Sequence, residues 1–378
     1  MPIVLLYAIG FIIALVLALL MTPLVRKFAF KVGAIDKPNH RKVHTRIMPR
    51  LGGLAIYIAF VGAFLLVSPF IPDGLLRPRD VNMINALLVG GTIIIIIGAL
   101  DDRFELSAKI KLLGQIAAAC VVVFGFEVRI DLVNIPFGET MQPIASWIGI
   151  PITILWIVGV TNAINLIDGL DGLAAGVSGI AISTIVVMAS LMGFQPVILL
   201  GTLLLGGIVG FLVFNFHPAK IFMGDSGSLF LGFSLATLSM LGFKQVTLVS
   251  FVIPLLIIGV PLSDTFFAIV RRWVNKKPIF APDKDHLHHR LQDLGYSHRR
   301  TVLIIWGVAA IFGVLAIIQS AVVQSSAANW ITFGVICLLL FFLQIGAELI
   351  GIVDKTRRPL INFLARLAKV DTQQSRGK

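Results

Sequence analysis

Charged residues are scarce in this chain. Asp, Glu, Lys and Arg together make up 13% of the 378 residues, whereas soluble globular domains carry roughly 25%. Apolar residues account for 57% of the sequence, and the mean hydropathy is +0.97. This composition excludes an ordinary soluble enzyme. It predicts an all-α polytopic membrane protein, because apolar helices satisfy their own backbone hydrogen bonds inside a bilayer.

Cysteine is also scarce, and its placement excludes two further classes. Cys120 and Cys337 both lie in apolar runs, which is not the pattern of a disulfide framework or of a structural zinc site. The formal net charge is +12, but no basic–aromatic module accompanies it, so nucleic acid is not expected as a partner. We interpret the basic residues as topology anchors instead.

Long apolar runs predict eleven membrane spans, most of them near the ~20 residues that a bilayer requires. The first, residues 2–25, has no basic leader or small-residue cleavage site and is followed directly by Arg26 and Lys27, as in an uncleaved helix that starts outside. The span at 148–160 is short and is expected to continue into the polar stretch after it. The remaining spans are expected at 51–71, 83–100, 112–127, 176–193, 197–214, 229–243, 248–270, 301–319 and 329–351.

The distribution of positive charge predicts the orientation. With the N-terminus outside, the inner segments hold 27 of the 31 Lys and Arg residues, the excess that cytoplasmic loops carry. The C-terminus is then cytoplasmic. Residues 1–351 are expected to form one transmembrane domain, and 352–378 a basic tail that rests on anionic membrane lipid. The inner segments that precede this tail are 26–50, 101–111, 161–175, 215–228 and 271–300.

The inner segment 161–175 contains Asn162, Asn165, Asp168 and Asp171, spaced three residues apart. Side chains at this spacing share one face of a helical turn. Polar groups at a membrane edge are costly to bury, so such a cluster indicates a functional site. We interpret it as one wall of a cytoplasmic site for a metal and a nucleotide; the alternative is a polar connecting turn with asparagine caps.

Two adjacent carboxylates, Asp101 and Asp102, end an apolar run. Like charges about 4 Å apart repel by roughly 4 kcal/mol at an effective dielectric constant of 20. A bound cation or a shared proton would relieve that repulsion, whereas the alternative is a solvated helix end. Lys109 and Lys111 follow closely and would meet an anionic ligand.

Two later segments add an acidic and a basic motif. Gly-Asp-Ser-Gly-Ser at 224–228 precedes an apolar run, and backbone N–H groups at a helix start favour phosphate. Asp225 is either a ligand there or an N-cap, and Phe222 either packs in the core or stacks on a base. Asp-His-Leu-His-His-Arg at 285–290 offers imidazoles and a guanidinium to a diphosphate; the alternative is an inert surface run.

The first inner segment is rich in basic residues, which are interpreted as anchors or as ligands of an anion. Its acidic residue, Asp36, is expected to matter far less for activity than Asp225. Taken together, the inner segments supply hard oxygen ligands that suit Mg²⁺ and basic groups that suit phosphates.

These motifs, in this order, resemble the polyprenyl-phosphate N-acetylhexosamine-1-phosphate transferases of glycosyltransferase family 4. The stretch Asp36-Lys-Pro-Asn and the His-x-His-His form at 286–289 look like the branch that uses UDP-GlcNAc and starts wall teichoic acid, O-antigen or enterobacterial common antigen. The sister branch makes lipid I from UDP-MurNAc-pentapeptide. An ion-coupled transporter is the alternative from another class, but transporters place ionisable groups near the bilayer midplane.

The resemblance implies a Mg²⁺-dependent enzyme, with Mn²⁺ as a substitute, in the bacterial plasma (inner) membrane. It would transfer GlcNAc-1-phosphate from UDP-GlcNAc to undecaprenyl phosphate and release UMP, and a homodimer is compatible with it. Asp225 would be the principal metal ligand and Asn165 a second ligand or close partner. Asp101 and Asp102 would be catalytic and face the lipid phosphate, by direct transfer or through a phosphorylated aspartate. The remaining implied substrate-binding residues are Lys111 for phosphate; Asn162, Asp168 and Asp171 along the nucleotide; Asn215 and Phe222 at the uracil; and His286, His288, His289 and Arg290 at the diphosphate and sugar.

Overall fold

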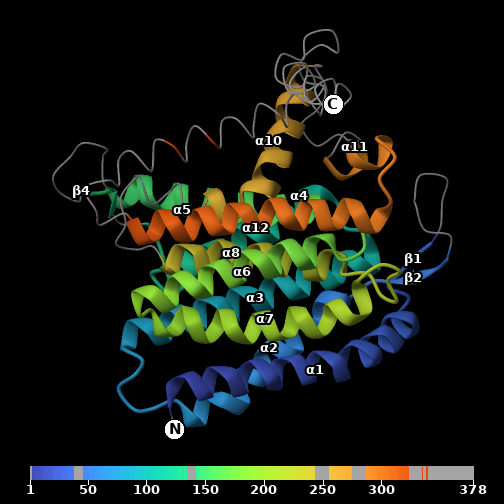
Figure 1. The fold of residues 1–378 in the computed structure, drawn as a ribbon. Coiled ribbons are helices and arrows are strands. Elements are labelled where there is room, and N and C mark those ends of the chain that lie inside the picture. The colour runs from blue at the N-terminus through green and yellow to red at the C-terminus, as the bar shows by residue number, and fades with distance from the viewer. Residues whose placement is uncertain are drawn as a thin grey trace, which may run out of the picture.

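The computed structural model describes residues 2–37, 46–130, 132–133, 142–242, 255–274 and 287–322, together with residues 334 and 338. Within these ranges the protein is a helical bundle, which confirms the predicted all-α class (Figure 1). The helices are α1 (Ile3–Val32), α2 (Gly52–Val67), α3 (Pro78–Phe104), α4 (Ala108–Cys120), α5 (Ser146–Ile167), α6 (Leu173–Met192), α7 (Gln195–Asn215), α8 (Gly224–Gly242), α10 (Gly259–Val274), α11 (Leu287–Asp293) and α12 (His298–Val322).

Two short antiparallel hairpins complete the regular structure. Strand β1 (Ile35–Asp36) pairs with β2 (Met48–Pro49), and β3 (Leu132–Val133) pairs with β4 (Gln142–Pro143). A 3₁₀ turn (Ser68–Phe70) extends α2, and a π-helical turn (Val121–Gly125) extends α4.

Among the described residues, eight helices are long and apolar enough to cross a membrane. Large apolar side chains on α1, α3 and α5 remain exposed on the surface of the bundle, where lipid would cover them. The chain is therefore a multi-pass membrane protein. The predicted span 229–243 corresponds to α8, which carries Asp225 and is not among these eight helices. The predicted span 248–270 is described only from residue 255. The predicted span 329–351 and the tail 352–378 lie outside the described residues, apart from residues 334 and 338.

Several predicted inner loops are shorter than expected, because the helices extend through their polar ends. Asp101 and Asp102 lie in the last turn of α3, and Asn162 and Asn165 lie on α5 rather than in a loop. The short span predicted at 148–160 thus continues into the polar stretch, as expected. The connection between α5 and α6 is reduced to residues 168–172.

Helix α8 occupies the centre of the bundle and packs against α2, α3, α5, α6 and α7 (Figure 1). Every residue from Ser226 to Met240 is buried. Its sequence has apolar or small residues on all faces, as expected of a helix enclosed by others. The first turn of α8 is therefore held among the surrounding helices of the bundle.

Glycines let the neighbouring helices approach the first turn of α8 closely. A side chain on Gly53 of α2 would overlap the backbone of Gly227, and one on Gly98 of α3 would overlap the backbone of Ser226. Small residues permit such backbone contact between membrane helices, where van der Waals packing contributes strongly to association. These two contacts fix α8 between α2 and α3.

The end of the bundle that carries β1, β2 and α11 is called the site end here; the N-terminus lies at the opposite end (Figure 1). Backbone hydrogen bonds join the hairpin to the segment before α8. Phe222 N donates to Pro49 O at 2.9 Å, and Gly52 N donates back to Phe222 O at 3.0 Å. Gly53 N donates to Met223 O at 2.9 Å. The first inner segment is thereby attached to the start of α8.

We predict that Gly53→Leu destabilises the protein strongly, because the added side chain has no space against Gly227. Overpacking costs about 1–3 kcal/mol and more where backbone must move. Gly159→Leu is the matched control, since no atom lies within 4 Å of a side chain placed there. Thermal unfolding in detergent should show a lower Tm for the Gly53 variant alone. Equal Tm values for the two variants would show that α2 and α8 are not closely packed.

Candidate active site

A cavity of about 450 Å³ opens among the segments at the site end, a volume typical of small-molecule sites. The connections after α5 and α7 contribute to its wall, together with the first turn of α8, the β1–β2 hairpin and the segment around α11. Five carboxylates line it: Asp36, Asp102, Asp168, Asp171 and Asp225. So dense a cluster of acidic groups requires positive charge or protons to balance it.

Asp225, in the first turn of α8, is the centre of a polar network from three other helices. Lys111 Nζ of α4 lies 2.8 Å from Asp225 Oδ2 and 3.3 Å from Asp101 Oδ2 of α3. Asn165 Nδ2 of α5 donates to Asp225 Oδ1 at 3.2 Å and to Ser228 Oγ at 2.8 Å. The ammonium group of Lys111 thus bridges the carboxylates of Asp101 and Asp225.

This network fits a divalent cation such as Mg²⁺. Two carboxylates and an amide are hard oxygen ligands of the kind Mg²⁺ takes, once rotation of the Asn165 amide presents its oxygen. Asp101 Oδ1 is buried and has no hydrogen-bond partner among the described residues. A buried carboxylate oxygen without a donor is costly, and a cation beside it would remove that cost. The residues that would hold the ion are Asp225, Asp101 and Asn165.

Asp102 has different surroundings from its neighbour Asp101. Its Oδ1 accepts a hydrogen bond from Asp225 N at 2.8 Å, and its Oδ2 accepts bonds from Ser226 N at 3.1 Å and Ser226 Oγ at 2.7 Å. A carboxylate of α3 therefore caps the N-terminus of α8, where free N–H groups and the helix dipole favour negative charge. Gly224, at φ 72°, keeps the space beside this carboxylate clear.

Asp168 follows the last residue of α5, and its backbone N–H donates to Asn165 O at 3.3 Å. Burial, together with the nearby carboxylates of Asp225, Asp102 and Asp171, raises the pKa of its carboxyl group to about 8. In the protein without a bound cation, a proton on Asp168 thus offsets part of the negative charge of the cavity.

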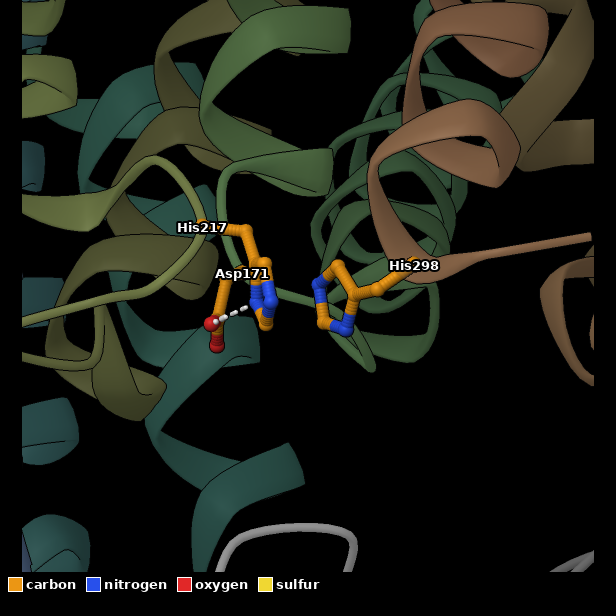
Figure 2. Close-up of side chains that lie close together, drawn as sticks. All are labelled: Asp171, His217 and His298. Atoms are coloured by element: carbon orange, nitrogen blue, oxygen red, sulfur yellow. Dashed lines mark hydrogen bonds and ion pairs between the residues drawn. The ribbon is translucent and has the colours of Figure 1, made fainter.

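Asp171, His217 and His298 form a compact cluster on the cavity wall (Figure 2). Asp171 Oδ2 lies 2.8 Å from His217 Nδ1 and accepts a hydrogen bond from Ala219 N at 3.1 Å. The rings of His217 and His298 are stacked, with centroids 4.1 Å apart and planes inclined by 22°.

One potential ligand atom from each residue of this cluster lies within 4.8 Å of the others. Imidazole suits Zn²⁺ and other transition metals rather than Mg²⁺. The ring nitrogens of stacked rings point along nearly parallel planes, so one ring would have to rotate before both bound the same ion. In the present arrangement, Asp171 fixes His217, and the cluster offers flat ring faces and hydrogen-bonding groups to a ligand.

Asn215 ties two connections together from beneath the cavity. Its Oδ1 accepts a hydrogen bond from Gly172 N at 3.1 Å, and its Nδ2 donates to Ile221 O at 3.0 Å. The side chain is buried, and these bonds engage both ends of its amide. Asn215 therefore holds the connection after α5 against the segment that precedes α8.

The structure places the predicted site residues differently relative to the cavity. Asn162 lies on α5 but does not line the cavity, because its amide faces α4 and Nδ2 donates to Gln115 Oε1 at 2.5 Å. His288 and Arg290 lie on α11 outside the lining, and His288 packs against His289. Asp101 and Lys111 adjoin the cavity through Asp225. His286 lies outside the described residues. The residues that line the cavity are Asp102, Asn165, Asp168, Asp171, Asn215, Phe222, Asp225 and His289.

Four lining residues with ionisable side chains were not among the predicted site residues: Asp36, Arg50, His217 and His298. His217 lies within a recognised polar motif, two residues after Asn215, and was open to prediction on that ground. Asp36 and Arg50 belong to the basic first inner segment, where charge pattern alone does not separate anchors from ligands.

These features define a multi-pass membrane protein with an acidic, cation-compatible pocket at one end of its helices. The glycosyl transferase family 4 model matches residues 84–243, which include α8 and most of the polar network. A probable undecaprenyl-phosphate N-acetylglucosaminyl 1-phosphate transferase of Bacillus subtilis is 48% identical over 96% of this chain and 97% of its own length.

Two further relatives carry related names. A decaprenyl-phosphate N-acetylglucosaminephosphotransferase of Mycobacterium tuberculosis is 37% identical over 75% of this chain and 74% of its own. An undecaprenyl-phosphate alpha-N-acetylglucosaminyl 1-phosphate transferase of Escherichia coli is 28% identical over 84% of each chain. The protein belongs to the polyprenyl-phosphate GlcNAc-1-phosphate transferase family, which confirms the resemblance found in its motifs.

We predict that Asp102→Ala lowers thermal stability as well as activity. The substitution leaves the N–H groups of Asp225 and Ser226 and the Ser226 hydroxyl without their acceptor. Each buried unsatisfied donor costs about 1–3 kcal/mol. Asp101→Ala removes the contact of its carboxylate to Lys111 but leaves the hydrogen bonds at the start of α8 in place, and should change Tm less. Thermal unfolding of both variants tests this; an unchanged Tm for Asp102→Ala would contradict the capping role.

Proposed function

We propose that this protein transfers GlcNAc-1-phosphate from UDP-GlcNAc to undecaprenyl phosphate, giving undecaprenyl-diphosphate-GlcNAc and UMP. The main structural support is that Asp101, Asp102 and Asp225 meet Lys111 and Asn165 at one end of a membrane bundle. The names and identities of the relatives support the same sugar and lipid class. Such a product would start a cell-envelope glycopolymer, for example wall teichoic acid or O-antigen.

We propose further that the protein lies in the bacterial plasma membrane with its pocket at the cytoplasmic face. The basic residues support this orientation: Lys31 lies in the last turn of α1 and Arg103 in the last turn of α3, near the site end. Arg77 and Arg79 lie at the opposite end of α3. The full proposal is eleven spans with the N-terminus outside, a basic tail at 352–378, and a homodimer as a compatible assembly.

Mg²⁺ is the proposed cofactor, held by Asp225 with Asp101 and Asn165 beside it; Mn²⁺ would serve as a substitute. A bound divalent ion would stabilise negative charge on the diphosphate and on the departing UMP. Lys111 already bridges two of these carboxylates. A bound ion would take over these carboxylates and leave the ammonium group of Lys111 available to a phosphate oxygen, which is the role that the family resemblance implies for Lys111.

The proposed reaction is a direct displacement. An oxygen of the lipid phosphate attacks the phosphorus that carries the sugar, and the bond from that phosphorus to the UMP oxygen breaks. The electron pair leaves with UMP. Phosphoryl transfer depends mainly on positioning and charge stabilisation. A phosphate monoester has a second pKa of ~6 and is largely ionised at neutral pH. Most lipid phosphate groups can therefore attack without first losing a proton.

The surroundings of the two aspartates support direct transfer over a phosphorylated intermediate. The Asp102 carboxylate already accepts three hydrogen bonds at the start of α8. A carboxylate engaged in this way is a poor nucleophile, and its loss would disturb Asp225. Asp101 has one oxygen without a hydrogen-bond partner in the described part of the chain, so it is the better placed group to take up a residual proton or to position the lipid phosphate.

The remaining lining residues would bind the donor. Asp168, Asp171 and Phe222 would border the nucleotide, and His289 would meet the diphosphate or the sugar. Asn215 would act indirectly, since its amide bonds hold the two connections that carry Asp171 and Phe222.

The donor assignment is tested by incubating the purified protein with undecaprenyl phosphate and one of three labelled donors: UDP-GlcNAc, UDP-GalNAc or UDP-MurNAc-pentapeptide. We expect a lipid-linked product and UMP from UDP-GlcNAc, and no turnover after EDTA until Mg²⁺ or Mn²⁺ is restored. A product from UDP-MurNAc-pentapeptide alone would indicate the lipid I reaction instead. If no donor releases UMP, the proposed activity is contradicted.

We predict that Asp225→Asn abolishes turnover at all Mg²⁺ concentrations, because the amide loses the charge that would hold the ion. Asp73→Asn is the matched control, since Asp73 is exposed and does not line the cavity. Initial rates over a range of Mg²⁺ concentrations compare the two variants with the wild type. Near-normal turnover of the Asp225 variant at high Mg²⁺ would rule out its role as principal ligand.

A further inference from the structure

The cavity has many carboxylates and very few permanent positive charges. Among the described residues that line it, Arg50 is the one Lys or Arg side chain. Its other basic groups are imidazoles, whose charge depends on protonation, and Lys111 lies behind Asp225 rather than in the lining. Both proposed substrates carry phosphate, so a fixed cation in this wall has a clear use.

Arg50 is held in place by side-chain and backbone bonds. Its Nη2 donates to Asp36 Oδ1 at 2.6 Å, and its backbone N–H donates to Ala34 O at 3.0 Å. Residues 35–36 and 48–49 pair as the β1–β2 hairpin between these contacts. The next residues of the chain bond to the segment before α8, as described above. The guanidinium group is therefore fixed relative to Phe222 and Asp225.

The pair leaves most of the guanidinium free for a ligand. Arginine has five N–H donors, and among the described residues Asp36 is the one side chain to which Arg50 donates. The Asp36 side chain is 9% exposed, whereas the Arg50 side chain is 23% exposed. Both side chains line the cavity, and the guanidinium group is the more exposed of the two.

We propose that Arg50 binds a phosphate group of a substrate and that Asp36 is the positioning residue that orients it. Guanidinium groups match phosphate oxygens in geometry and remain charged at all physiological pH values. The assignment rests on the proposed function and deepens it, by identifying which basic residue of the first inner segment acts in binding. It also revises the expectation that Asp36 contributes little.

The phosphate belongs to the nucleotide donor or to the lipid acceptor, and separate binding measurements distinguish the two. Binding of UDP and of undecaprenyl phosphate to detergent-purified protein is measured for the wild type, Arg50→Gln and Arg50→Lys. We expect Arg50→Gln to weaken one of the two by about 10- to 100-fold, as for loss of a charge-assisted hydrogen bond. Arg50→Lys should recover part of that loss. Arg79→Gln, an exposed residue at the far end of α3, is the matched control.

Asp36→Asn tests the positioning role. Alone it should weaken binding of the same ligand, by a smaller factor than Arg50→Gln. Combined with Arg50→Gln it should add nothing, because Asp36 acts through Arg50. In turnover assays, the KM for that substrate should rise more than kcat falls. An additive double variant would contradict the positioning role, since additivity is expected of independent sites.

The inference fails if Arg50→Gln binds UDP and undecaprenyl phosphate as tightly as the wild type, or if it lowers only Tm while the surviving folded protein binds normally. These binding measurements need no turnover. A wild-type protein that binds UDP through Arg50 but releases no UMP from UDP-GlcNAc would overturn the proposed function and leave the Arg50 assignment standing.

Discussion

The contact on which the site depends is the cap that Asp102 of α3 places on the first turn of α8. Three hydrogen bonds fix the start of a helix that is buried from Ser226 to Met240, and Asp225 lies in that same turn. Gly53 and Gly98 allow α2 and α3 to approach closely enough for the cap to form. The close packing of the helices therefore allows the cap, and the cap in turn fixes the position of the Asp225 carboxylate.

The cavity is acidic to a degree that folding alone would not favour. Asp225 and Asp101 share Lys111, Asp36 is paired with Arg50, and Asp171 is bonded to His217. Burial raises the pKa of Asp168 to about 8, so a proton on Asp168 offsets negative charge that the basic side chains leave uncompensated. Each of these partners can be replaced when a ligand binds. A divalent ion and an anionic substrate would take over the same roles, which is why a cluster so costly in isolation is suited to a phosphate-transferring site.

The membrane bundle was predictable from sequence because each span is a local property: an apolar run of sufficient length, with basic residues at one end. The same reasoning located the polar helix ends that form the cavity. It did not predict which of several nearby polar residues in one motif contacts which helix. Asn162 and Asn165 are three residues apart, yet one bonds to Gln115 and the other to Asp225, because each step along a helix turns the side chain by about 100° and so decides which neighbouring helix it meets. The adjacent Asp101 and Asp102 differ for the same reason.

Arg50 illustrates what lies beyond local pattern. In the sequence it is one of many basic residues at a membrane edge, where anchoring explains any of them equally well. Its distinction comes from a hairpin that pairs residues 35–36 with 48–49 and from bonds that join this hairpin to Phe222 and Met223. Those contacts hold the guanidinium group beside a buried carboxylate in the wall of the open acidic cavity. A cation so placed is fixed before substrate arrives, so binding a phosphate costs little of the side-chain entropy that a free surface arginine would lose.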